Sequence, residues 1–315
     1  MDRSLVVGGV IFVLLLAMPV VLPLIGQGYL TGLLIKAMLL AIAAISLDLL
    51  IGHGGMVSLG HAAFIALGAY AAAIGLEIGI ENILILLLLT LALTGFVALV
   101  TGTLALRTSG LYFLMITLAF GQMAFFTLSS LAAYGGDDGL TLWTLATLFG
   151  SDIVQKGGGL YFVVLATLIA TWWGVFRISQ SRFGRVLRAA RDNPERTEVM
   201  GYSVKRYRLI AYVIAAMIAG VSGLLLVQHA EFVSPALGTW QRSGDLIVVV
   251  VLGGLATRNG AILGALFLVI VEEVLGSFMH EWRLIYGPLL VVMVLFAKGG
   301  LSDLLVPKRS NGPVT

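Results

Sequence analysis

Long apolar runs separated by short polar segments constrain this chain more than any other feature. A helix needs roughly twenty apolar residues to cross the hydrocarbon of a bilayer. Runs of this kind occupy residues 5–25, 29–51, 82–106, 110–133, 159–178, 208–230 and 261–280. Only 11% of the 315 residues are charged, whereas a soluble domain carries about 25%. Because backbone groups in lipid must be satisfied within a helix or a closed barrel, the sequence predicts an all-α, polytopic membrane protein.

Three further segments are less regular. Residues 284–298 form a shorter run, residues 55–76 are rich in Gly and Ala, and residues 244–256 are very short. Counted as spanning or re-entrant, they bring the prediction to about ten helices in one transmembrane domain over residues 1–315. Ser58-Leu59-Gly60 and Ser243-Gly244-Asp245 each precede a run of small residues, which predicts two loosely repeated halves, as many transporters have.

The charge distribution predicts the orientation of the helices. The chain has a formal charge of +3, and many of its basic residues lie between Arg182 and Arg208. Positive loops stay in the cytoplasm, so this pattern indicates topology and contact with the bilayer, and no nucleic-acid partner. If each span crosses the membrane in turn from this loop, residues 179–207 and the tail 302–315 lie inside and residues 134–158 lie outside. Both termini are then in the cytoplasm.

The cytoplasmic loop 179–207 contains a short helix with both ends marked. Asn193 is a good N-cap, Pro194 suits the first helical position, and Gly201 can close a helix in the left-handed conformation. We therefore expect a short cytoplasmic helix over residues 194–200 that docks on a partner. The residues expected to carry this coupling are Pro194, Glu195, Glu198, Met200 and Gly201.

The arginines before this helix recur every three residues, roughly on one helix face, at positions 182, 185, 188 and 191. We expect them to hold the helix at the membrane surface. No lysine follows the GxxxxG pattern of a phosphate-binding loop, so if ATP drives this protein, another chain hydrolyses it. The sequence predicts no catalytic residues, no metal site among its four scattered histidines and no cofactor in this chain.

A second candidate region runs from Leu50 to Ala73, where four glycines (52, 54, 55 and 60) interrupt a helix. Ser58 and His61 then lie on the first turn of the next helix. A broken helix offers free N–H groups inside the membrane, which would suit a polar solute. The alternative is that the small residues only allow close helix packing, and Gly60, Gly68 and Ala72 are the residues expected to pack in this way.

Four acidic residues, Asp48, Asp245, Glu272 and Glu273, lie within apolar runs. Ionisable groups at membrane depth often mark a pathway. Together with Ser58 and His61, Asp48 and Asp245 are therefore candidates for a translocation pathway. The four acids also raise the alternative of an ion-driven secondary transporter, or they pair structurally. An Asp48–Lys36 pair is also conceivable, but the twelve-residue gap spans about 18 Å along one helix, so the two side chains would not meet within it.

Four motifs resemble a known family. They are SLDLLIGHGGMVSLGHAAFIALGAY, YGGDDGL, RAARDNPERTEVMGYSVKRYRLIAYVIAAMIAGVSGLLL and DLIVVVVLGGLATRNGAILGA. In order and spacing they resemble the LivM-type permeases of branched-chain amino acid ABC importers. Members of that family often have Asn where this chain has Asp48. Related permeases carry urea, amides or other amino acids, so the substrate stays open at this point.

The resemblance implies a function and a set of partners. It implies that Glu195 to Gly201 form the coupling helix, and that the chain is not itself an enzyme. The implied partners are a second permease in a heterodimer, two ATP-binding cassette ATPases that hold ATP and Mg, and an extracytoplasmic substrate-binding protein. The implied location is the bacterial inner membrane.

Overall fold

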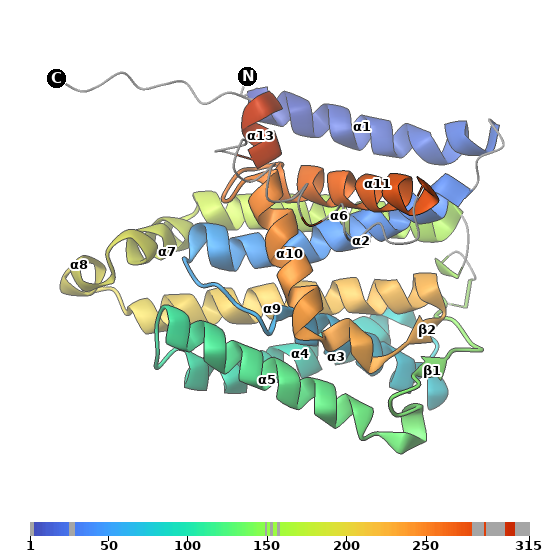
Figure 1. Ribbon diagram of the computed structural model, residues 1–315, viewed down its shortest axis with the longest axis horizontal. Coiled ribbons are helices and arrows are strands. Elements are labelled where there is room, and N and C mark those ends of the chain that lie inside the picture. The colour runs from blue at the N-terminus through green and yellow to red at the C-terminus, as the bar shows by residue number, and fades with distance from the viewer. Residues whose placement is uncertain are drawn as a thin grey trace.

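The apolar runs fold into helices that lie side by side (Figure 1). The computed structural model describes residues 3–24, 29–148, 150–151, 154–155, 158–278, 287 and 300–305. The long helices are α1 (Arg3–Leu24), α2 (Tyr29–Asp48), α3 (His61–Glu77), α4 (Ile83–Ala105), α5 (Leu111–Ser129), α6 (Gly158–Gln180), α9 (Val204–Ala230) and α11 (Gly260–Phe278). Among these described residues, six segments are long and apolar enough to cross a membrane: residues 29–53, 83–105, 111–129, 158–180, 204–230 and 260–277. The prediction of a helical, multi-spanning membrane protein is therefore confirmed.

Shorter elements connect these helices. They are η1 (Leu49–His53, a π-helix), η2 (Ala132–Tyr134), α7 (Arg182–Asp192), α8 (Pro194–Val199), η4 (Pro235–Gly238), α10 (Trp240–Gly253) and α13 (Gly300–Leu305). Two strands of two residues each, β1 (Leu140–Thr141) and β2 (Phe232–Val233), pair antiparallel. This pair and two isolated β-bridges, Asn82 with Thr147 and Leu148 with Ser151, are the β-structure within the described residues. The strand pair ties the loop after α5 to the segment that follows α9.

The interior is built from α2, α3 and α9, which approach one another closely. Gly68 of α3 lies against the backbone of Gly220 in α9, and Gly223 of α9 lies against the carbonyl of Ile65. A side chain at either glycine would strike backbone atoms. Small residues let helices in lipid gain van der Waals contact and interhelical bonds. The expected packing role of Gly68 is thus confirmed, and Ala72 is fully buried beside it.

The two ends of the helix bundle differ (Figure 1). The helices α7 and α8 project at one end, whereas β1 and β2 lie at the opposite end. The loops 179–207 and 134–158 therefore leave the bundle at opposite ends, as the threading of charges requires. The helix α10 crosses the direction of its neighbours (Figure 1) and has 14 residues. At about 1.5 Å per residue it is too short to span a bilayer.

Two sequence predictions about the count and symmetry of helices are not established. The run 284–298 lies outside the described residues except for residue 287, so the figure of about ten spanning or re-entrant helices stays a prediction. Ser58 precedes α3, and Ser243 lies near the start of α10. The two helices differ in length, with 17 residues in α3 and 14 in α10. The two loosely repeated halves also stay a prediction.

Candidate functional site

The short helix α8 has the caps that the sequence predicts. The backbone N–H of Arg196 donates to Asn193 Oδ1 at 2.9 Å, and Pro194 occupies the first turn. Gly201 has φ +88°, a conformation that favours glycine, and its N–H donates to the carbonyl of Glu198 at 2.9 Å. The helix ends at Val199, one residue before the expected Met200, which forms its C-cap. These local hydrogen bonds fix both ends of α8.

The face that α8 presents outward is partly apolar. The five residues predicted to carry coupling, Pro194, Glu195, Glu198, Met200 and Gly201, are all exposed. Val199 is 89% exposed and Met200 is 68% exposed. Apolar side chains on a projecting polar helix, flanked by carboxylates, are typical of a docking surface. Sequence reasoning missed Val199, although an apolar residue inside a polar loop is a usable signal.

The inner face of α8 is held by one buried side chain and a group of rings. Thr197 is 3% exposed, and its hydroxyl donates to the carbonyl of Asn193 at 2.9 Å. Tyr202, just after α8, meets Tyr207 of α9 edge-on at 6.0 Å, and Tyr207 stacks on Phe183 of α7 with centroids 5.4 Å apart. The helix is therefore attached to both α7 and α9.

The preceding helix, α7, uses its arginines to bond backbone carbonyls. Arg188 donates to the carbonyl of Ser179 at 2.8 Å, and Arg185 donates to that of Gln180 at 3.1 Å. Both carbonyls belong to the last turn of α6, where acceptors are left unpaired by the helix. Two of the four regularly spaced arginines therefore fasten α7 to the end of a span. We call α7 and α8 together, residues 182–199, the coupling unit.

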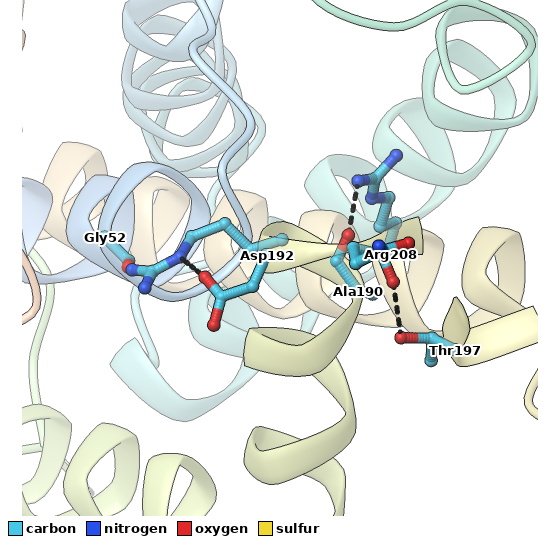
Figure 2. A network of polar contacts seen from close by, with 7 residues as sticks. Gly52, Ala190, Asp192, Thr197 and Arg208 are labelled. Carbon is cyan, nitrogen blue, oxygen red and sulfur yellow. Dashed lines mark hydrogen bonds and ion pairs between the residues drawn. The ribbon is translucent and has the colours of Figure 1, made fainter. Parts of the chain in front are cut away.

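The coupling unit is bonded to two further helices (Figure 2). Arg191 donates from Nη1 to the carbonyl of Gly52 in η1, and its Nε lies 3.0 Å from Asp192 Oδ1. From the other side, Arg208 of α9 donates to the carbonyl of Ala190 at 3.0 Å. The coupling unit is thus bonded to η1, which follows α2, through Arg191 and to the start of α9 through Arg208.

The break after α2 is tied to the short crossing helix α10. Asp48 Oδ1 accepts a bond of 2.9 Å from the N–H of Ala256, just after α10. At the other end of α10, Ser243 Oγ accepts a bond of 3.0 Å from the N–H of Ala62, in the first turn of α3. Side chains across the fold thus satisfy backbone groups that the interrupted helices leave open. The break and α10 form one connected unit.

The predicted pathway residues lie around this unit. His61 is fully buried and its Nε2 lies 2.8 Å from Ser46 Oγ. Ser58 is also fully buried, and its hydroxyl has no hydrogen-bond partner. Asp245 lies on the exposed part of the first turns of α10. His61 begins α3, as expected from the sequence, whereas Ser58 lies before this helix and not on its first turn. A role of the four residues in translocation stays a prediction.

The intramembrane acids do not gather at one place. Glu272 Oε2 lies 3.8 Å from Lys36 Nζ, and Glu273 accepts from the hydroxyl of Tyr29 at 3.1 Å. Along α2, Lys36 lies about 18 Å and Tyr29 about 28 Å from Asp48. Lys36 thus pairs with Glu272 and not with Asp48, and nothing here supports an ion-driven transporter. The described residues contain no His, Cys, Asp and Glu group able to hold a metal ion.

Comparison with known proteins decides the family. The family model for the permease component of branched-chain amino acid transport systems matches residues 29–297. The chain belongs to this family. The match includes η1, the coupling unit, α10 and α11, so the elements described above are parts of a transport permease component.

Individual relatives agree with this membership. The chain is 28% identical to the high-affinity branched-chain amino acid permease LivM of Escherichia coli K12, over 99% of this chain and 79% of that protein. It is 29% identical to LivM of Salmonella typhimurium LT2, over 86% of this chain and 69% of the relative. A probable LivH permease of Methanocaldococcus jannaschii is 31% identical, over 43% of each chain. No solved structure matched the chain.

Proposed function

We propose that this chain is the permease subunit of an ATP-driven ABC importer that carries branched-chain amino acids across the bacterial inner membrane. Family membership, together with the docking surface of α8, carries this proposal. In it, both termini and the coupling unit lie in the cytoplasm. A second permease, two ATP-binding cassette ATPases with their ATP and Mg, and an extracytoplasmic binding protein complete the importer. This chain supplies mechanical coupling and lines the translocation path, with no catalysis and no cofactor of its own.

The mechanism follows from the bonds of the coupling unit. When the ATPases close on ATP, they push α8 through its exposed Val199 and Met200. The displacement passes through Arg191 to the carbonyl of Gly52, at the end of α2. Because Asp48 is bonded to the turn after α10, the break and α10 move together. The path beside Asp48, Ser58, His61 and Asp245 would then open alternately to each side of the membrane.

The docking role is tested by two substitutions in α8. Gly201→Pro is incompatible with φ +88°, since proline requires about −65°, and it removes the N–H that bonds Glu198. Glu198→Lys reverses the charge of the exposed face without changing the fold. We expect both variants to reach the membrane and to lose most stimulation of ATP hydrolysis by the loaded binding protein.

A charge reversal at the other end of the bundle is the matched control. Glu77 is exposed at the end of α3, so Glu77→Lys should leave co-purification of the ATPases unchanged, whereas Glu198→Lys should reduce it. Unchanged ATPase binding and unchanged stimulation in both α8 variants would show that α8 is not the docking element. ATP-independent uptake by this chain alone would overturn the whole proposal.

A further inference from the structure

The glycine-rich turn YGGDDGL, residues 134–140, has no part in the roles proposed above. Its backbone bonds to itself, because the N–H of Asp138 donates to the carbonyl of Gly135 at 3.1 Å. Gly135 and Gly139 have φ +86° and +84°, a conformation that favours glycine. A side chain on Gly139 would also strike the carbonyl of Val233 in β2. The turn is therefore fixed against β2, at the end of the bundle opposite α8 (Figure 1).

This end of the molecule is acidic. Asp137 and Asp138 lie in the middle of the turn, and both are exposed. The segments that meet here, residues 77–83, 134–158 and 230–239, are joined by the strand pair and by the bond from the N–H of Thr147 to the carbonyl of Glu81. Together they contain six acidic residues and one lysine. The fixed turn thus presents two carboxylates from a surface of the same sign.

An exposed aromatic ring lies close to the turn along the chain. Trp143 is 90% exposed, the largest exposed fraction of any large apolar side chain in the described part of the chain. The backbone on both sides of it is held in place. The N–H of Leu142 donates to the carbonyl of Glu231 at 2.9 Å. The N–H of Ala146 donates to Gln228 Oε1 at 3.0 Å, and both donor residues are buried. A fixed backbone therefore holds the indole out in solvent.

These features fit a protein partner better than a lipid surface. Tryptophan also lies at membrane interfaces, but the carboxylates around Trp143 would repel anionic headgroups. In protein interfaces, tryptophan is a common hot-spot residue, and charges around the hot spot select the partner by complementarity. A partner that complements this surface has basic residues around an apolar pocket.

We propose that Asp137, Asp138 and Trp143 form an outer docking surface for a soluble protein with a basic contact face. In the proposed orientation this end of the bundle is extracytoplasmic, so the partner is the substrate-binding protein. That identification rests on the proposed function. The permease then has a docking surface at each end: α8 for the ATPases, and the outer docking surface for the protein that delivers the substrate.

The test titrates the complete importer in detergent with its binding protein, loaded with L-leucine, and measures stimulation of ATP hydrolysis. We expect Trp143→Ala to raise the half-maximal concentration of binding protein by about tenfold or more, as the loss of a hot-spot residue does. Trp143→Phe keeps a ring and should raise it less. Because the indole is exposed, Trp143→Ala should melt at the wild-type temperature, which separates weaker docking from misfolding.

Trp173→Ala is the matched control for the loss of an exposed indole. Trp173 is 58% exposed on α6, and it lies about 22 Å along this helix from its start at residue 158. We expect the half-maximal concentration to stay at the wild-type value. An equal rise in Trp173→Ala and Trp143→Ala would overturn the outer docking surface.

Salt tests the carboxylates. Asp137→Asn combined with Asp138→Asn should raise the half-maximal concentration by about threefold to tenfold at low salt, and by less at about 0.5 M salt, because exposed charges are screened. Trp143→Ala should keep its effect at both. A fall in the double variant would mean an acidic partner and overturn the proposal. An effect of Trp143→Ala in liposomes but not in detergent would indicate lipid contact and overturn it too.

The outcomes also separate this inference from the proposed function. If the loaded binding protein stimulates the wild type and the outer variants equally, the outer docking surface is wrong and the proposed function stands. If it does not stimulate the wild-type importer, both are wrong.

Discussion

The chain interrupts its spanning helices in two contrasting ways. The first interruption, residues 49–60 after α2, is largely buried, and its polar groups bond to distant segments such as Thr117. The second, residues 181–203, is largely exposed, and local caps at Ser181 and Asn193 begin its two helices. The difference shows where the backbone groups of each interruption find their hydrogen-bond partners. The buried break bonds partly within itself, as the N–H of Met56 does to the carbonyl of Leu50, and partly to distant segments, whereas local caps begin both helices of the exposed segment.

The largest expected effect comes from adding a side chain to the buried interruption. Gly60 lies directly against the backbone of Thr117 and Gly121 in α5. Gly60→Val would force α3 and α5 apart, and overpacking against rigid backbone costs about 3 kcal/mol or more. We expect little folded permease in detergent, measured by monodispersity in size-exclusion chromatography and by thermal unfolding.

Gly174→Val is the control for that substitution. Gly174 also lies inside a spanning helix, α6, but has open space around it, so it should lose less than about 1 kcal/mol. Equal stability of the two variants would mean that the buried interruption is not closely packed, and the contrast between the two regions would fail.

A smaller effect is expected at Asp48, whose bond to Ala256 joins the buried interruption to α10. Asp48→Ala leaves the N–H of Ala256 without its acceptor in a partly buried bond, which costs about 1–3 kcal/mol, and should lower both the melting temperature and ATP-driven uptake. Asp48→Asn keeps an oxygen at the same place and should retain most uptake, because the proposed role needs an acceptor and not a proton carrier. Complete loss of uptake in a stable Asp48→Asn variant would favour a charge-dependent role.

The smallest effect is expected at the bond that links the two interruptions. Arg191→Gln removes the donor to the Gly52 carbonyl but leaves the caps of α8 intact. We expect ATP hydrolysis to continue while uptake per ATP falls by about twofold to tenfold, the range that corresponds to weakening one charged hydrogen bond. Uptake and hydrolysis should be measured together in proteoliposomes. A proportional fall of both would show that Arg191 stabilises docking and does not transmit motion.

The sequence by itself determined the membrane class, the positions of the long helices and the limits of α8. These depend on local physics. A run of about twenty apolar residues is long enough to span the bilayer. An Asn-Pro pair at the start and a glycine at the end define a short helix wherever it lies. The resemblance of four motifs also identified the family that comparison later established.

Only the tertiary structure decided how the interruptions are connected. The pairing of Asp48 with Ala256 and of Arg191 with Gly52 joins residues more than a hundred positions apart. No pattern of spacing encodes such a contact, because its partner is a backbone group that every residue carries. The packing of α11 against α2 likewise decides that Lys36 meets Glu272 and not Asp48. Which side chains reach which carbonyls depends on helix packing, and packing here depends on glycines whose contacts appear only in the folded chain.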